Sequence, residues 1–367
     1  MNLIKERKVE NIELFYDLIF VYAISKVSGL IHHSHHGIVE PWAFINFVLA
    51  SLVILQEWLY LTDYLNRFGT FNFRELVVMG INMTAAIYLS NSLLADWSQI
   101  YYPFTISMLV MSSSVGFLYH CQANKKGFGE KEATIMRNIL IVICSLLLIC
   151  LFVYFHIVVI LLIIINLLGA FLPVFFRTKF DNSITHFGHL KERFELLTIL
   201  FFGEMIVSIT KYFDIKNFTI FPFIALVTIL SLFGTYTFFI NKMISHHHQK
   251  TRGLILMHSH FSLLISLGII TSAWNLAGEE TNKTFLVLFY ILGYIGFYVT
   301  LFINGIYLEK ENRLNKKEYL KISGILIISF ALMLIFRENF VIIELLMLFF
   351  SLSILWIVYK KYSEIRI

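Results

Sequence analysis

The chain has 367 residues, of which 58% are hydrophobic and only 14% charged, and its net charge is +5. Soluble domains usually carry about a quarter charged residues, so this composition excludes an ordinary soluble enzyme and indicates a membrane protein. The basic residues lie between apolar runs rather than on one face, which argues against a nucleic-acid partner.

Apolar runs recur along the whole chain, and a helix needs about 20 such residues to cross a bilayer. We predict an all-α integral membrane protein with twelve transmembrane helices. Ten or eleven spans stay open, because the first and seventh runs contain acidic residues and the fifth and sixth are barely separated. The predicted spans are 11–31, 41–62, 74–95, 101–122, 134–154, 156–176, 190–210, 219–241, 254–276, 284–308, 319–336 and 340–360.

Lysine and arginine are unevenly distributed between alternate connections. With twelve spans, 24 of the 29 Lys and Arg fall on one side of the membrane, 4 fall on the other, and Lys26 lies within the first span. Since cytosolic loops carry the excess of positive charge, both termini are placed in the cytosol. No loop is long enough to form a separate soluble domain, so any chemistry must occur within the helices or at their ends.

The two halves of the chain carry similar features. Glu13 and Glu192 each precede a phenylalanine by two residues at the start of a span, and Arg74 and Arg252 each precede the third span of their half. Six spans separate the halves, so they share one orientation. This favours a parallel 6+6 repeat, with halves at 1–180 and 181–367 in a single membrane domain; the alternative is twelve unrelated helices.

Ionisable residues inside spans are the first candidates for function, because each costs free energy unless it faces protein or water. Glu13 and Asp17 are four residues apart and therefore share one helix face. They could bind a cation, hold a proton, or simply pair with an arginine. Glu204 follows Gly203 deep in the seventh span, where a carboxylate must be neutral or paired.

Further candidates lie in the second, seventh and ninth spans. Glu192 and Arg193 stand at the start of the seventh, where Arg193 could neutralise Asp17 or Glu204 from a neighbouring helix or join a local salt-bridge network. Glu57 lies well within the second span. His258 and His260 lie in the ninth, where a histidine can relay protons near neutral pH or act as a buried hydrogen-bonding group.

Signals for metals and cofactors are weak. Histidines cluster at positions 32–36 and 246–248, but no cysteine or patterned carboxylate accompanies them, so we expect no metal site. The chain lacks a P-loop, a dinucleotide fingerprint, HExxH and GxSxG. We therefore expect no cofactor and no ATP-driven pump, and a role as an enzyme is disfavoured without being excluded.

Three segments resemble a known family. The run ELFYDLIFVYAI from Glu13 to Ile24 is similar to the opening signature of the bacterial low temperature requirement A protein family, and HLKERFELLTILFFGE from His189 to Glu204 is similar to its second. The stretch 258–271 resembles the third, a histidine-bearing helix. Glu195 and Met205 stand where the family pattern has small residues. The resemblance implies a multi-pass bacterial membrane protein linked by name to growth in the cold, and it supplies no mechanism.

Two functional hypotheses follow. The first is a secondary transporter or channel-like permease for a cation, proton or small solute in the bacterial cell membrane, based on the spans, the intramembrane carboxylates and the lack of an ATP motif. The second is a non-transporting membrane factor, either a lipid-handling enzyme or a sensor of membrane state. The lipid bilayer is the expected partner in both, and the sequence does not give the oligomeric state.

Overall fold

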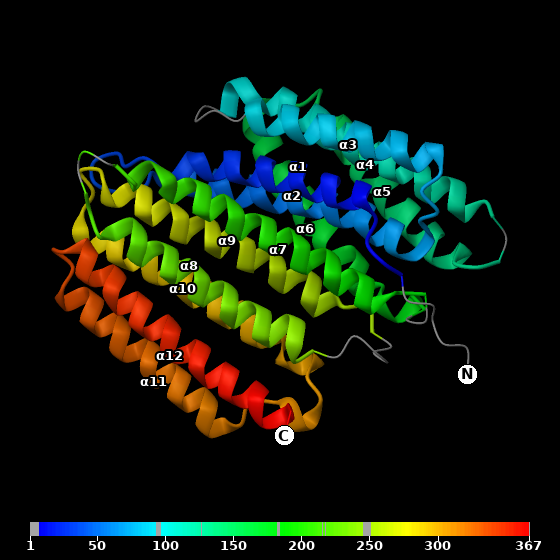
Figure 1. The fold of residues 1–367 in the computed structure, drawn as a ribbon. Helices are drawn as coiled ribbons and strands as arrows, with labels where there is room; N and C mark the ends of the chain where they lie inside the picture. Colours follow the sequence, from blue (N-terminus) through cyan, green and yellow to red (C-terminus); the bar gives the residue numbers. More distant parts are fainter. Residues whose placement is uncertain are drawn as a thin grey trace. The chain divides into compact units, whose positions relative to one another are not determined.

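A computed structural model describes the chain except for residues 1–6, 93–96, 126, 182–183, 215, 217, 245–250 and 367. The described residues form long α-helices joined by short connections and contain no β-strand (Figure 1). Each of the twelve predicted apolar segments coincides with one α-helix, so the prediction of an all-helical protein is confirmed. The histidines at 246–248 lie outside the described residues.

The chain divides into two compact units, each described by itself. Unit 1 comprises Met1–Leu30, Trp42–Leu196 and Gln249–Met257, and unit 2 comprises Ile31–Pro41, Leu197–His248 and His258–Ile367. The units are not the predicted halves at 1–180 and 181–367. They reflect packing rather than duplication, so the repeat stays a prediction.

Unit 1 is built around α2. Its helices are α1 (Asn11–Ser28), α2 (Pro41–Phe68), α3 (Phe73–Ser92), α4 (Trp97–Ala123), α5 (Glu130–Cys150), α6 (Phe155–Phe175) and the first turns of α7 (Phe187–Ile209). From Val53 to Phe68, α2 is buried on nearly all sides, as expected of a helix enclosed by others. Because that stretch also carries polar residues, their partners must be other protein groups rather than water or lipid.

Unit 2 contains the rest of α7 and the helices that follow it. These are α8 (Phe221–Tyr236), extended by a π-helical turn (Thr237–Lys242), α9 (Leu254–Ala277), α10 (Lys283–Ile303), α11 (Lys316–Ile335) and α12 (Phe340–Arg366). In the most apolar 18-residue stretch of α9, 72% is buried, whereas in the corresponding stretch of the segment containing α11 only 17% is buried. Figure 1 shows α11 packed along α12. An apolar helix this exposed is suited to contact with lipid.

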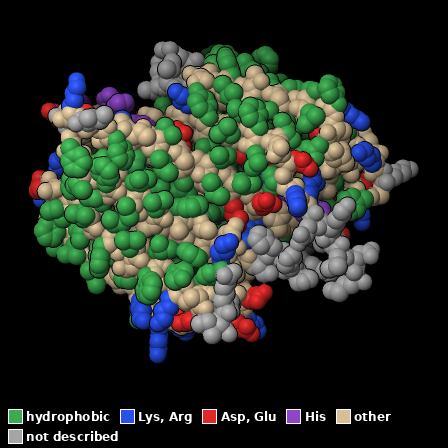
Figure 2. Space-filling model, in the orientation of Figure 1, with side chains coloured by type: hydrophobic (Ala, Val, Ile, Leu, Met, Phe, Trp, Pro, Cys, Tyr) green, Lys and Arg blue, Asp and Glu red, His purple; other side chains and the backbone are tan. Residues whose placement is uncertain are grey.

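The surface agrees with a membrane location. Figure 2 shows hydrophobic side chains over much of the visible face, with charged side chains in smaller groups. Of the helices in the described residues, ten are long and apolar enough to cross a membrane. The two that are not counted are α3 and α7, and α7 begins with the charged run Lys191 to Glu195. The protein is therefore a multi-pass membrane protein, and a count of twelve spans stays a prediction.

Candidate functional site: a buried charge cluster

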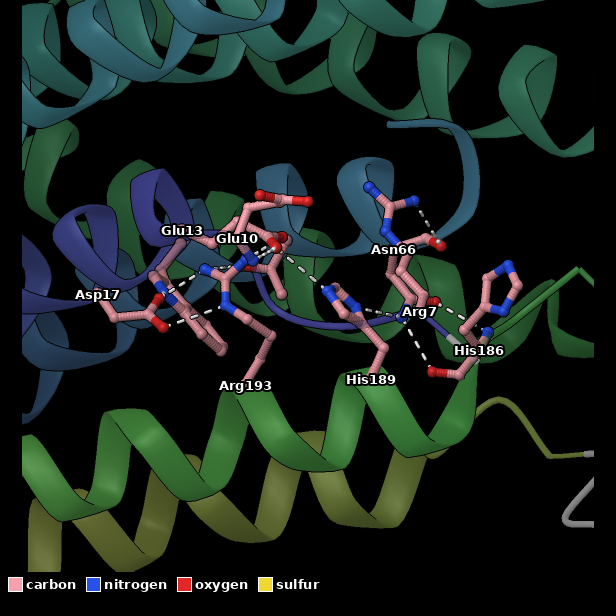
Figure 3. Close-up of polar contacts among 10 residues, drawn as sticks. Arg7, Glu10, Glu13, Asp17, Asn66, His186, His189 and Arg193 are labelled. Atoms are coloured by element: carbon pink, nitrogen blue, oxygen red, sulfur yellow. Dashed lines mark hydrogen bonds and ion pairs between the residues drawn. The ribbon is translucent and has the colours of Figure 1, made fainter. Parts of the chain in front are cut away.

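Three helices of unit 1 bring polar side chains to one place (Figure 3). On each helix the contributing residues are four apart, so they lie on a single face. Helix α1 supplies Glu13 and Asp17, α2 supplies Trp58, Thr62 and Asn66, and α7 supplies His189 and Arg193. Glu13 also fixes the start of α1, because its Oε2 accepts the backbone N–H of Glu10 at 3.0 Å. We call this set the charge cluster.

Arg193 is the centre of the charge cluster. Its Nη1 donates to Glu13 Oε1 at 2.6 Å, and its Nε and Nη2 donate to the two carboxylate oxygens of Asp17 at 3.0 and 2.5 Å. This two-point pairing uses the planar fork of the guanidinium group. All three side chains have no exposed surface. Of the partners that the sequence left open for Arg193, the structure shows Asp17, and the arginine pairs with Glu13 as well.

Two aromatic side chains, Trp58 and Phe194, lie beside the ion pairs. The indole N–H of Trp58 donates to Asp17 Oδ1 at 2.7 Å, and the Arg193 guanidinium lies 5.6 Å from the Trp58 ring centroid. Phe194 packs edge-on against Trp58 with 4.9 Å between ring centroids. The rings keep water away from the charges, which strengthens the electrostatic interactions between them.

The protonation of His189 follows from its neighbours. Asn66 Oδ1 accepts the backbone N–H of His186 at 3.1 Å and its Nδ2 donates to the His186 carbonyl at 3.0 Å, which fixes the orientation of the Asn66 amide. The same Nδ2 faces His189 Nδ1 at 3.0 Å, so Nδ1 must accept. We therefore assign the proton to Nε2, which donates to Glu13 Oε2 at 3.2 Å, and treat His189 as neutral.

The charges of the cluster do not cancel. Two carboxylates, one guanidinium and a neutral imidazole leave one negative charge in excess. A further cation, Arg7, is half-buried and donates to the Asn66 carbonyl at 3.5 Å rather than to either carboxylate. Burial lowers the pKa of Arg7, and the charge of Glu13 opposes that shift. Each of the four carboxylate oxygens accepts at least one N–H.

The other predicted residues of the first two spans and the start of α7 lie apart from the charge cluster. Glu57 is buried in α2, where Ser112 donates to its Oε1 and its Oε2 has no hydrogen-bond partner among the described residues. Glu192 is half-buried on α7 and takes no part in the Arg193 contacts described above. Its neighbour Glu195 forms an ion pair with Lys191 at 3.3 Å within the same helix.

The remaining predicted residues belong to unit 2. Glu204 is half-buried on α7 and is not one of the groups that meet at Arg193. His260 is fully buried and lies 3.0 Å from the hydroxyl of Tyr236, whereas His258 is half-buried beside Phe261. The two histidines therefore differ in burial: His260 is a fully buried hydrogen-bonding residue, whereas His258 is only half-buried.

A second buried carboxyl lies in unit 2, on α12. Glu344 Oε2 accepts from the hydroxyl of Tyr290 at 2.5 Å and from the indole of Trp274 at 3.1 Å. Tyr294 extends the contact, with its hydroxyl 3.4 Å from that of Tyr290. Glu344 has no exposed surface, and its partners in the described part of the chain are neutral.

Sequence reasoning missed several members of the charge cluster. His189 lies just before the predicted seventh span, 190–210, and so is not among the intramembrane candidates. Trp58 and Asn66 are not ionisable and are not singled out by residue type. A usable signal was present: His189 and Arg193 are one turn apart on α7, and Trp58 and Asn66 are two turns apart on α2. Both pairs thus share a helix face.

The helices and the charge cluster define a multi-pass membrane protein with an ionic site enclosed by its own helices. The profile of the bacterial low temperature requirement A protein (LtrA) family matches residues 8–359. The chain belongs to this family. No curated protein and no solved structure matches the chain. The charge cluster joins the first two resembling segments: Glu13 and Asp17 come from one, and His189 and Arg193 come from the other.

Proposed function

We propose that this protein is a secondary transporter that moves protons, alone or coupled to a small solute, and that the charge cluster is its proton-binding site. The observation that carries the proposal is the excess of one buried negative charge around Arg193. An uncompensated buried charge is costly, and binding one proton removes it. Glu13 and Asp17 share that proton, Arg193 holds both in place, and His189 orients Glu13.

The geometry favours a proton over a metal cation. A sodium or potassium ion needs several oxygen ligands, but every carboxylate oxygen of Glu13 and Asp17 already accepts an N–H. A proton needs only one carboxylate oxygen, which then becomes a hydrogen-bond donor and needs one acceptor. Glu57 in unit 1 and Glu204 in unit 2 are separate candidates for proton binding in this proposal, because each is a carboxyl group within a predicted span.

The topology that we propose has twelve spans, both termini in the cytosol and two parallel six-helix halves at 1–180 and 181–367. The distribution of Lys and Arg supports it, since 24 of 29 lie on the side assigned to the cytosol. In this arrangement α7 is a span despite its charged start. Its residues Lys191, Arg193 and Glu195 are buried and form ion pairs with protein partners, which supports placing them away from lipid. The proposed location is the bacterial cell membrane.

The test is proton flux in liposomes containing the purified protein, with a pH gradient and then a potassium gradient applied. We expect flux for the wild type and at least a tenfold loss in Asp17→Asn, because the amide keeps the shape but removes the exchangeable charge. Glu75→Gln is the matched control. Its carboxylate is also buried in unit 1, where it accepts bonds from the turn at residues 70–72 and makes none to Arg193, so the variant should leave flux unchanged.

Two results of the flux experiment would contradict the proposal. Equal flux in the wild type and in Asp17→Asn would remove the charge cluster from the transport path. No flux from folded wild-type protein under any gradient would overturn the transporter proposal and favour the second hypothesis, a membrane factor that handles lipid or senses membrane state.

A further inference from the structure

A second group of buried cations lies at one end of unit 1 and is not used by the proposed function. Arg67, in the last turn of α2, is 4% exposed. Its Nε donates to Asp63 at 2.9 Å, while Nη1 and Nη2 have no hydrogen-bond partner among the described residues. Buried polar nitrogens are nearly always bonded, so these two terminal groups call for a ligand or solvent.

Arg252 accompanies Arg67. It precedes α9, is 5% exposed, and donates from Nη1 to the carbonyl of Pro173 at 3.4 Å, while its Nε lacks a partner within the described part of the chain. Burial, followed by the charge of Arg67, lowers the pKa of Arg252 to about 10. The two guanidinium groups face the same ring: they lie 3.6 Å (Arg252) and 5.5 Å (Arg67) from the centroid of Phe180.

Phe180 also lines a surface pocket. The pocket has a volume of about 570 Å³ and lies between the turn before α5 and the segment that follows α6. This size is within the usual range for sites that hold small molecules. Lys131 and Lys179 line it, as do the acidic residues Glu130, Glu132 and Asp181.

The position of the pocket points to a lipid. It adjoins the end of α4, the start of α5 and the end of α6, all helices of spanning length, so it lies where headgroups meet the protein. Phe128 lines the pocket and is 67% exposed, which gives it an apolar edge suited to acyl chains. Lining residues of both signs favour a zwitterionic headgroup over a polyanion.

We propose that this pocket binds a zwitterionic phospholipid headgroup, with its ammonium group on Glu130 and Asp181. Arg67 and Arg252 contact Phe180 and are not lining residues of the pocket, so the proposal includes a rotation of the Phe180 side chain that lets the phosphate reach them. Arginine forks are suited to phosphate, because they offer several N–H donors in one plane. Glu132 already accepts the backbone N–H of Asp181 at 2.9 Å, and Asp63 is paired with Arg67 Nε. Neither of these carboxylates therefore competes fully for the unpartnered arginine nitrogens. This inference is independent of proton transport.

The experiment is binding of dihexanoyl phosphatidylethanolamine to the full chain in detergent. We expect saturable binding that is weakened at least tenfold in the double variant Arg67→Lys, Arg252→Lys. Lysine keeps the positive charge at both positions, including that of residue 67 beside Asp63, but lacks the planar guanidinium group. Arg252→Lys alone leaves the Arg67–Asp63 pair untouched and should weaken binding in the same direction, so the test survives a folding defect in the double variant. Arg74→Lys, at an exposed arginine of α3, is the matched control and should bind as the wild type does.

Two further ligands identify the source of the phosphate. Dihexanoylglycerol, which lacks the headgroup, should bind at least tenfold more weakly, and inorganic phosphate should compete only weakly. Equal binding by wild type and both lysine variants, or by dihexanoylglycerol, would overturn the site. Tight, arginine-dependent binding of inorganic phosphate without preference for the lipid would overturn the headgroup assignment.

Discussion

Each of the two units buries a carboxyl centre, and the two centres have partners of different charge. In unit 1, Glu13 and Asp17 surround Arg193 and are held by charge-assisted hydrogen bonds. In unit 2, Glu344 meets Trp274 and Tyr290, whose donors are neutral. The first centre depends on a cation and the second depends only on hydrogen bonding. Burial alone therefore does not distinguish the two centres, whereas the charge of their partners does.

The comparison also explains why α7 has weak hydropathy. Three of the charged residues that lower its hydropathy form ion pairs: Lys191 pairs with Glu195, and Arg193 pairs with the carboxylates of α1. Helix α12 keeps a strongly apolar sequence because Glu344 is its single acidic residue between Phe340 and Tyr362 and is met by aromatic donors. A site that includes a cation thus lowers the mean hydropathy of its helix, whereas a carboxyl with neutral donors changes it little.

The largest expected effect is that of Arg193→Met. Removing the cation leaves two buried carboxylates without compensation, which usually costs about 3–5 kcal/mol. We expect little folded protein, measured as the monodisperse fraction after purification and as the melting temperature. Arg193→Lys should be milder because it keeps the charge but not the fork. A Met variant as stable as the wild type would mean that the ion pairs do not stabilise unit 1.

A much smaller effect is expected for Glu344→Gln. The amide oxygen can still accept from Tyr290 and Trp274, so the loss should be about 1 kcal/mol or less, measured by thermal unfolding in detergent. If Glu344→Gln proved as damaging as Arg193→Met, Glu344 would have to be ionised and paired, and the contrast between the two centres would fail.

The smallest effect concerns pH. Burial, followed by the charge of Arg7, lowers the pKa of His186, which precedes α7. A histidine with a lowered folded pKa stabilises the fold fully above its unfolded pKa of about 6.5, and this contribution is lost as the pH falls below that value. In unit 2, burial raises the pKa of Glu279, but hydrogen bonds from Ser34 and His33 outweigh it and lower the pKa overall. The contribution of Glu279 is therefore lost only at lower pH, as the pH falls through that lowered value.

The matching variant is His186→Gln, which keeps the backbone bonds to Asn66 because those involve the main chain of residue 186. Its melting temperature should fall less than that of the wild type between about pH 7.5 and about pH 5.5. A wild type and variant with the same pH dependence would remove His186 as a source of acid sensitivity.

Much of the fold could be predicted from the sequence, because apolar runs of spanning length are a direct consequence of lipid as solvent. Each predicted run became a helix, and Glu13 with Asp17 was identified from depth and spacing. The partners could not be predicted in full. Whether Arg193 meets Asp17, Glu204 or neither depends on which helix faces lie together, and hydropathy does not contain that information. His189 and Asn66 act through hydrogen-bond geometry, which their residue types do not reveal. Glu344 is an ionisable residue inside the predicted span 340–360, but its aromatic donors could not be predicted from hydropathy.

The central claim is that the charge cluster holds one exchangeable proton, and infrared difference spectroscopy of the protein in liposomes tests it most directly. On acidification we expect a carboxylic acid C=O band in the wild type and in Glu344→Gln, and its loss in both Asp17→Asn and Glu13→Gln, because either amide removes the excess negative charge. An identical band in all four proteins would show that the proton binds elsewhere and would contradict the account.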